Sequence, residues 1–168
     1  MRASDHRKRV IAAVMGAALA VLAVITPVSG ATPKSVTIIA RTYFSDYYPN
    51  SFFGGPFAAA GSAVENGLIC GSGHHNDTAD SVHGYQSGTG IQIQNHGVFT
   101  CDDGTILLKV QIHSSFGSVQ GETFTWVVEG GTGAYVDLHG SGDGFTVAGI
   151  DANDQYYHEG HMTGFLLH

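Results

Sequence analysis

The stretch Ile91–His113, IQIQNHGVFTCDDGTILLKVQIH, carries the strongest fold signal in the chain. It contains two β-rich runs, 91–101 and 106–113, joined by Asp102-Asp103-Gly104. Asp-Gly between two such runs is typical of a tight hairpin. Because side chains alternate along a strand, every second residue of each run faces the same side. The sequence therefore predicts an antiparallel hairpin with one apolar face.

Similar short runs, separated by Gly, Asp, Asn and Ser, recur on both sides of this hairpin. We expect further strands over 36–43, 63–70, 122–129, 135–147 and 155–167, a connection over 47–57, and a long loop or weak strand over 71–90. Such spacing is typical of an antiparallel barrel or sandwich. We predict an all-β fold, a single antiparallel eight-stranded barrel, because closure leaves no open sheet edge.

Two cysteines, Cys70 and Cys101, test the assignment of faces. In an oxidising compartment an isolated pair most simply forms a disulfide. A bridge between neighbouring strands requires both sulfurs on one side. That side then holds the alternate residues of the two runs, namely Val64, Asn66 and Leu68 with Cys70, and Ile91, Ile93, Asn95 and Phe99 with Cys101. We predict the bridge and an inward orientation for both faces.

The N-terminus predicts export. Arg2, Arg7, Lys8 and Arg9 precede an apolar stretch, 10–27, which ends in small residues. These are the three parts of a secretory signal. We expect residues 1–31 to be a signal peptide, residues 32–168 to be the β-barrel domain, and the mature protein to be secreted. A retained membrane anchor is the alternative, since about 18 apolar residues approach the length of a span.

Removal of the leader makes the protein strongly acidic. Three basic residues then remain against 13 acidic ones, a net charge of about −10 with neutral histidines. Such a charge disfavours phosphate backbones and anionic membrane surfaces. We therefore expect no nucleic-acid partner and, after cleavage, no membrane partner.

On the run 122–129, Glu122, Phe124, Trp126 and Val128 form a further inner face. The predicted inner faces therefore carry three polar residues, Asn66, Asn95 and Glu122. A buried polar group without a partner costs on the order of 1–3 kcal/mol. Barrels of this size can enclose a cavity in which a few polar groups orient an apolar ligand. We predict that these three residues bind such a ligand, with Phe99, Phe124 and Trp126 lining its site. The alternative is a barrel packed solid with side chains.

The histidines do not form a metal-binding pattern. His158-Glu159-Gly160-His161 lacks the spacing of H-E-x-x-H, and on a strand its two histidines point to opposite faces. No G-x-S-x-G nucleophile motif occurs, and the glycines of 130–133 join two strands rather than a strand and a helix. We predict no metal and no cofactor.

One segment resembles a known family. Trp126-Val127-Val128-Glu129-Gly130-Gly131-Thr132-Gly133-Ala134-Tyr135, followed by Gly140-Ser141-Gly142, is similar to the G-G-T-G-x-[YF]…G-x-G corner of the allene oxide cyclase-like barrel superfamily, which includes the dirigent proteins. The stretch 99–104 resembles the preceding hairpin of its small exported actinobacterial members. The likeness covers 35–168.

The resemblance implies an eight-stranded barrel with an apolar cavity, often assembled as a homotrimer. Family members steer reactive apolar intermediates, and some are cyclases. The functional carboxylate and Asn of the cyclase branch do not align residue by residue; Glu65 and Asn66 lie nearby in order. At the acidic position of the dirigent pattern, Tyr43-Phe44-Ser45-Asp46 has Ser45 in place of histidine.

Two functions follow from these observations. The first is a secreted barrel that binds a small apolar molecule, with isomerase, cyclase or dirigent-like steering activity as the resemblance implies. The second is a non-catalytic cell-envelope or extracellular protein that acts through surface contacts. The acidic surface and the aromatic residues of 43–57 favour the second.

Overall fold

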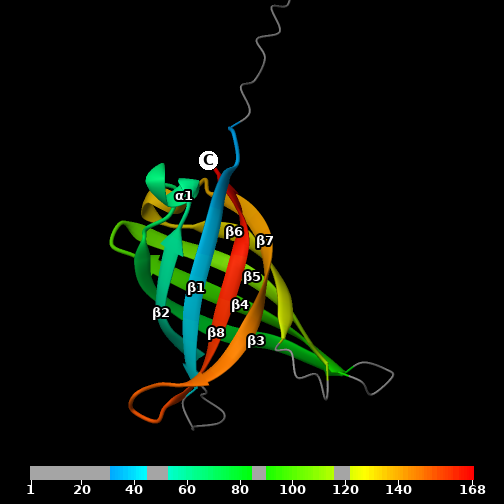
Figure 1. Cartoon of the computed structure of the whole chain (residues 1–168). Coiled ribbons are helices and arrows are strands. Elements are labelled where there is room, and N and C mark those ends of the chain that lie inside the picture. The colour runs from blue at the N-terminus through cyan, green and yellow to red at the C-terminus, as the bar shows by residue number, and fades with distance from the viewer. Residues whose placement is uncertain (1–30, 45–52, 85–89, 116–121) are drawn as a thin grey trace, which may run out of the picture. The chain divides into compact units, whose positions relative to one another are not determined.

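Each strand of the barrel pairs with its neighbour in the sequence, and the last strand pairs with the first. A computed structural model describes residues 31–44, 53–84, 90–115 and 122–168. In it, eight strands form one closed antiparallel sheet, as predicted (Figure 1). The strands are β1 Lys34–Phe44, β2 Phe53–Ala60, β3 Ser72–Gly84, β4 Gly90–Cys101, β5 Gly104–Ser115, β6 Thr123–Gly131, β7 His139–Ile150 and β8 Tyr156–Leu167. The predicted signal peptide lies, except for Ala31, outside the described residues.

The hairpin that dominates the sequence forms β4 and β5. Cys101 pairs with Gly104, so the turn consists of Asp102 and Asp103 alone. On β5, Ile106 and Leu108 are fully buried, and on β4 so is Phe99. The predicted alternation of inward and outward residues is therefore confirmed for this hairpin.

The expected strand over 63–70 is wrong. Residues Ser62–Glu65 form a short helix, α1, which lies over one end of the barrel (Figure 1). Gly61 and Gly67 have φ values of 107° and 70°, in the region that favours glycine, and they bracket the helix. Ala63 and Ile69 are buried against the barrel. The apolar residues that suggested a strand thus seal the end of the barrel instead.

The expected loop or weak strand over 71–90 is a full strand for most of its length. β3 is the longest of the eight, with 13 residues. Its inward positions include His75 and Asp77, which line the interior. Because polar residues occupy the side that is apolar in the other strands, the hydrophobic alternation that marks a strand is absent from this one.

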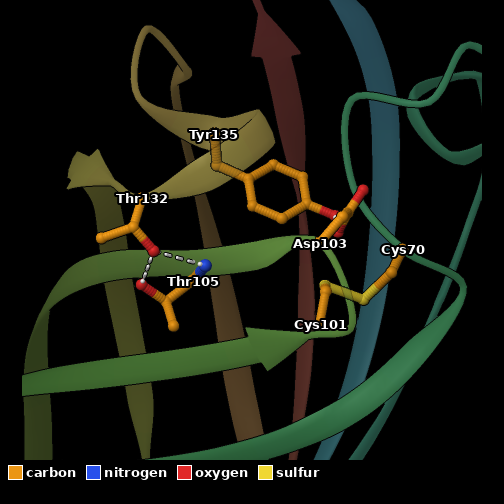
Figure 2. The surroundings of a disulfide bond; sticks show 6 residues. All are labelled: Cys70, Cys101, Asp103, Thr105, Thr132 and Tyr135. Atoms are coloured by element: carbon orange, nitrogen blue, oxygen red, sulfur yellow. Dashed lines mark hydrogen bonds between the residues drawn. A yellow bond between two sulfur atoms is a disulfide. The ribbon is translucent and has the colours of Figure 1, made fainter.

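The glycine-rich corner after β6 is locked to the β4–β5 hairpin. It continues into a single 3₁₀ turn, η1 (Gly133–Tyr135). The Tyr135 hydroxyl donates a hydrogen bond of 2.6 Å to Asp103, and the hydroxyl of Thr132 accepts one of 3.0 Å from the Thr105 N–H (Figure 2). A Cβ at Gly131 would lie 2.5 Å from the carbonyl oxygens of Thr105 and Tyr135. The G-G-T-G-x-Y corner, which suggested the family, thus joins the end of β6 to the β4–β5 hairpin by hydrogen bonds.

The predicted disulfide is present beside this corner. Cys70 and Cys101 are bonded, with their Cα atoms 6.0 Å apart (Figure 2). Cys101 ends β4, as expected. Cys70 lies in the connection between α1 and β3, and not on a strand. The bridge therefore ties the segment that covers the barrel end to the strand beneath it.

Large aromatic rings from β6 fill spaces left by glycines on β7 and β8. Gly142 and Gly164 pair across these strands, and a Cβ on either would lie 2.6 or 2.5 Å from the indole of Trp126. The rows of inward glycines therefore admit the bulky side chains that the sequence places opposite them.

Among the described residues, no helix is long and apolar enough to span a membrane.

Replacement of Tyr135 by phenylalanine tests the hydrogen bond between the Gly130–Tyr135 corner and the β4–β5 hairpin. Tyr135 is 1 % exposed, and burial, aided by the hydrogen bond to Asp103, raises the pKa of its phenol well above the usual value near 10. Loss of this bond to a charged acceptor should lower the free energy of unfolding by about 1.5–3 kcal/mol at pH 8. Denaturant titration measures the change.

The difference in the free energy of unfolding between wild type and Tyr135→Phe should depend on pH. The unfolded phenol ionises near pH 10 whereas the folded one stays protonated, so the stability contributed by Tyr135 is complete below pH 10 and declines above it. The difference in the free energy of unfolding between wild type and Tyr135→Phe should therefore narrow as the pH rises from about 10 to about 12. A difference that is constant over this range would contradict the assigned role.

Candidate functional site

A cavity of about 360 Å³ lies inside the barrel. It occupies the half farther from α1, since the start of β1 contacts α1 through Ser35 and Ser62, whereas the end of β1 contributes Thr42 to the cavity wall. This volume is near the lower end of the range for small-molecule sites. The walls are mainly apolar, with Ala40, Val82, Ile93, Phe99, Val110, Ile112, Phe124 and Met162.

Seven polar side chains also line the cavity. They are Thr42, His75, Asp77, Asn95, Glu122, Thr146 and His158. Thr42 and His158 are direct cross-strand partners on β1 and β8. Glu122 is fixed beside Thr146 by two hydrogen bonds, from the Glu122 N–H to the threonine hydroxyl and from the Thr146 N–H to the Glu122 carbonyl. The polar groups therefore extend around an otherwise apolar wall.

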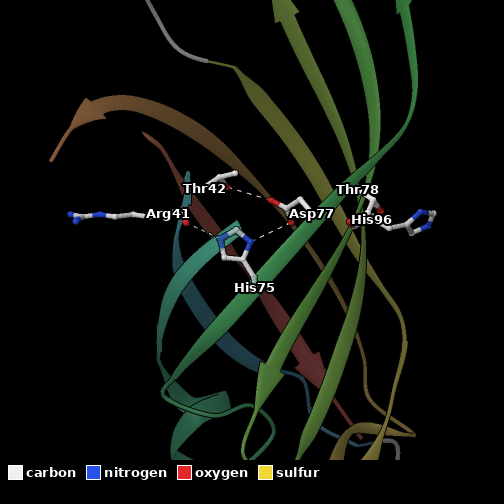
Figure 3. A network of polar contacts seen from close by, with 6 residues as sticks. All are labelled: Arg41, Thr42, His75, Asp77, Thr78 and His96. Carbon is white, nitrogen blue, oxygen red and sulfur yellow. Dashed lines mark hydrogen bonds and ion pairs between the residues drawn. The ribbon is translucent and has the colours of Figure 1, made fainter. Parts of the chain in front are cut away.

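His75 is almost completely buried, with an exposure of 1 %. Its ring stacks on Phe99, with 5.2 Å between ring centroids. Its Nδ1 lies 3.3 Å from Asp77 Oδ1, and its Nε2 lies 3.1 Å from the carbonyl oxygen of Arg41 (Figure 3). The Arg41 side chain points away from this contact (Figure 3). The ring thus links β3 to β1, two strands away.

The local sequence of β2 explains why the ring reaches this far. The pairing of β1 with β2 is interrupted between Ala40–Phe57 and Tyr43–Gly54, and the register on either side brings Arg41 opposite Pro56. Proline has no N–H to offer to a neighbouring strand, and the Arg41 carbonyl accepts its hydrogen bond from His75 instead. A Cβ at Gly55 would overlap the same carbonyl. Pro56 and Gly55 therefore permit a histidine to complete the hydrogen bonding of β1.

The hydrogen-bond partners of His75 define its protons. A carbonyl oxygen only accepts, so Nε2 must donate to Arg41. The other ring nitrogen faces a carboxylate oxygen, so a second proton lies between Nδ1 and Asp77. Thr42 donates to the second oxygen of Asp77 at 3.3 Å. His75 and Asp77 thus share one proton within a wall of the cavity.

Only some of the residues that the sequence predicted as ligand-binding line the cavity. Asn95, Phe99, Glu122 and Phe124 line the cavity. Trp126 is buried in the neighbouring layer, where its indole packs on Gly142 and Gly164, and it is not part of the cavity wall. The binding of a ligand by these residues stays a prediction.

The placement of Asn66 on an inner face is wrong. Asn66 follows α1, is exposed, and donates from Nδ2 to the carbonyl of Ser62 at 2.7 Å. It therefore caps the helix. The error has the same origin as the wrong strand over 63–70, because the side-chain alternation of a strand does not apply to the helix Ser62–Glu65 and the turn that follows it.

Sequence reasoning missed His75 and Asp77. Their separation of two residues puts them on one face of a strand, but the segment that contains them was expected to be a loop or a weak strand.

The prediction that His158 and His161 face opposite sides is correct: His158 lines the cavity, whereas His161 stacks on Phe145 outside it. Within the described ranges, no group of three or more His, Cys, Asp or Glu residues could hold a metal ion.

Comparison with protein-family models, with curated proteins and with solved structures finds no match to this chain. The resemblance of the 126–142 segment to the allene oxide cyclase-like superfamily therefore stays a prediction.

Replacement of His75 by phenylalanine tests the buried network. The variant keeps a planar ring against Phe99 but leaves the Arg41 carbonyl and the Asp77 carboxylate without their shared donor. We expect the free energy of unfolding to fall by about 1–3 kcal/mol. His74→Phe is the matched control, because His74 is exposed on the opposite face of β3 and should change stability by no more than about 0.5 kcal/mol. An equal loss in the free energy of unfolding for the two variants would contradict the assigned hydrogen bonds of His75.

Proposed function

We propose that this protein is a secreted barrel that binds a small, mainly apolar molecule inside its lumen. The observation that carries the proposal is the 360 Å³ cavity, whose apolar walls bear a limited set of polar groups. Such a combination is typical of small-molecule sites, in which apolar contacts supply affinity and a few polar groups fix orientation.

Secretion is part of the proposal. The predicted signal peptide supports it, and the disulfide between Cys70 and Cys101 is compatible with an oxidising compartment. The net charge of about −10 for the predicted mature chain would help to keep an exported protein dispersed.

The activity proposed for the barrel is isomerisation, cyclisation or dirigent-like steering of the bound molecule. The resemblance of the 126–142 segment supports this class of activity. A cavity of this size can accelerate such reactions by holding one reactive conformation, because confinement removes much of the entropic cost of reaching the transition state.

A non-catalytic cell-envelope or extracellular protein is the second candidate. It is favoured by large apolar side chains on the outside of the barrel. Phe145 and Val147 on β7 are 49 % and 48 % exposed, and Phe165 on β8 is 57 % exposed. An apolar outer surface of this kind is suited to contacts with another macromolecule.

Uptake of N-phenyl-1-naphthylamine, a neutral fluorophore that brightens in apolar surroundings, tests lumen binding. We expect saturable fluorescence enhancement with the wild-type protein. Ile112 lines the cavity, so Ile112→Trp should fill part of it and weaken uptake at least about 10-fold, the loss of roughly 1.4 kcal/mol of binding free energy.

Gln111→Trp is the matched control, since Gln111 is the exposed neighbour on the opposite face of β5. It should leave uptake unchanged. Equal uptake by both variants would place the fluorophore outside the lumen and favour the second candidate. Native mass spectrometry of protein purified from its own host would then identify any resident ligand.

A further inference from the structure

The Asp77 carboxylate is held on three sides within the cavity wall. His75 Nδ1 lies 3.3 Å from Oδ1, and the Thr42 hydroxyl donates to Oδ2 at 3.3 Å (Figure 3). On the third side, Gly97 leaves room for it, because a Cβ there would lie 2.8 Å from Oδ1. Two strands thus donate to the carboxylate, and a third strand accommodates it by the absence of a side chain.

The arrangement of donors suits an ionised carboxylate. Each oxygen of Asp77 faces a group that can donate, and the His75 ring, which already donates from Nε2 to Arg41, supplies the second proton from Nδ1. The His75 ring also stacks on the face of Phe99. Asp77 is therefore held by a polar neighbour at each oxygen beside an apolar wall.

Asp77 is also accessible from the cavity. Its side chain is 21 % exposed, whereas that of His75 is 2 % exposed. Both line the same cavity, together with the apolar side chains of Ile93 and Val110. A carboxylate whose orientation is fixed beside a cavity can accept a proton from a molecule held against it, because positioning replaces a random encounter in bulk solvent.

We propose that Asp77 is the general base of the cavity and that His75 and Thr42 are positioning residues that fix its orientation. This inference rests on the proposed function, since it requires that the lumen admit a small molecule. The substrate class is an apolar molecule with a carbon-bound proton made acidic by a neighbouring electron-withdrawing group. The reaction class is proton removal and return, an isomerisation or elimination without a cofactor.

The chemical step balances within the substrate and the carboxylate. Asp77 accepts the proton, and the electron pair of the broken C–H bond forms a new π bond to the neighbouring atom. In an isomerisation the displaced electrons capture the same proton, which Asp77 returns at another atom. In an elimination they leave with the departing group, and Asp77 releases its proton to that group or to water. Either route restores the carboxylate.

Elimination of 5-nitrobenzisoxazole tests this base. Removal of its ring C–H proton breaks the N–O bond and yields a coloured nitrile phenolate, with no other reactant. We expect the full-length protein to show saturable turnover faster than an equal concentration of acetate. Asp77→Asn should lower kcat at least about 100-fold, the minimum typical of a lost general base. Asp143→Asn, on the outer face of β7 where it binds Thr163, should leave kcat unchanged.

His75→Gln separates positioning from a purely structural role. Glutamine retains an amide donor but cannot donate to Arg41 and Asp77 in the geometry of the ring. We expect kcat to fall about 10- to 100-fold while KM stays unchanged, because misorientation of a reacting group affects the chemical step. His75→Phe should lower kcat further than His75→Gln. Thermal unfolding of each variant shows whether it is folded at the assay temperature.

The outcomes distinguish this inference from the proposed function. Turnover no faster than acetate, or an unchanged kcat in Asp77→Asn, overturns the assignment of the base. If N-phenyl-1-naphthylamine is still taken up in that case, lumen binding stands and only the base fails. If neither probe enters the lumen, both proposals fail.

Discussion

The structure depends on the pairing of β1 with β8, which closes the sheet. Ten residue pairs join these strands, from Lys34 with Leu166 to Tyr43 with Tyr157. Closure leaves no free sheet edge and forces the inward side chains of all eight strands into one lumen. The aromatic rings of β6 can then be accommodated only where β7 and β8 carry glycine, as at Gly142 and Gly164.

Closure also makes the two halves of the lumen different. At the α1 end, the disulfide and the bond between Tyr135 and Asp103 hold the connecting segments against the barrel, and buried apolar side chains such as Ile69 and Leu138 fill the interior. The other half contains the cavity and its polar groups. The G-G-T-G-x-Y corner therefore contributes to the site indirectly: it stabilises the sealed end, whereas the cavity lies in the opposite half.

The sequence was sufficient for the parts of the fold in which local pattern and tertiary burial agree. The β4–β5 hairpin, the inward faces of β5 and β6, and the disulfide follow from alternation, turn residues and cysteine pairing. The errors lie where tertiary contacts override the pattern. Residues 63–70 are apolar because they cover the barrel end, and β3 lacks apolar alternation because its inward positions are polar.

The site was predictable to the same extent. Asn95 and Glu122 were found because each interrupts an apolar face, whereas Asn66 was misplaced together with its segment. His75 and Asp77 could not be found in this way, since no apolar face surrounds them in the sequence. Their partner is a backbone carbonyl on β1. Pro56, on the strand between β1 and β3, leaves this carbonyl to His75, and such a relation is visible only in three dimensions.

The central claim is that the half of the lumen that contains Asp77 is a binding site for a small molecule. Intermolecular nuclear Overhauser effects between bound N-phenyl-1-naphthylamine and the methyl groups of the protein test it most directly. We predict contacts to Ile93, Val110 and Ile112, which line the cavity. Contacts confined to outward methyl groups, such as those of Val127 and Val147, would contradict it.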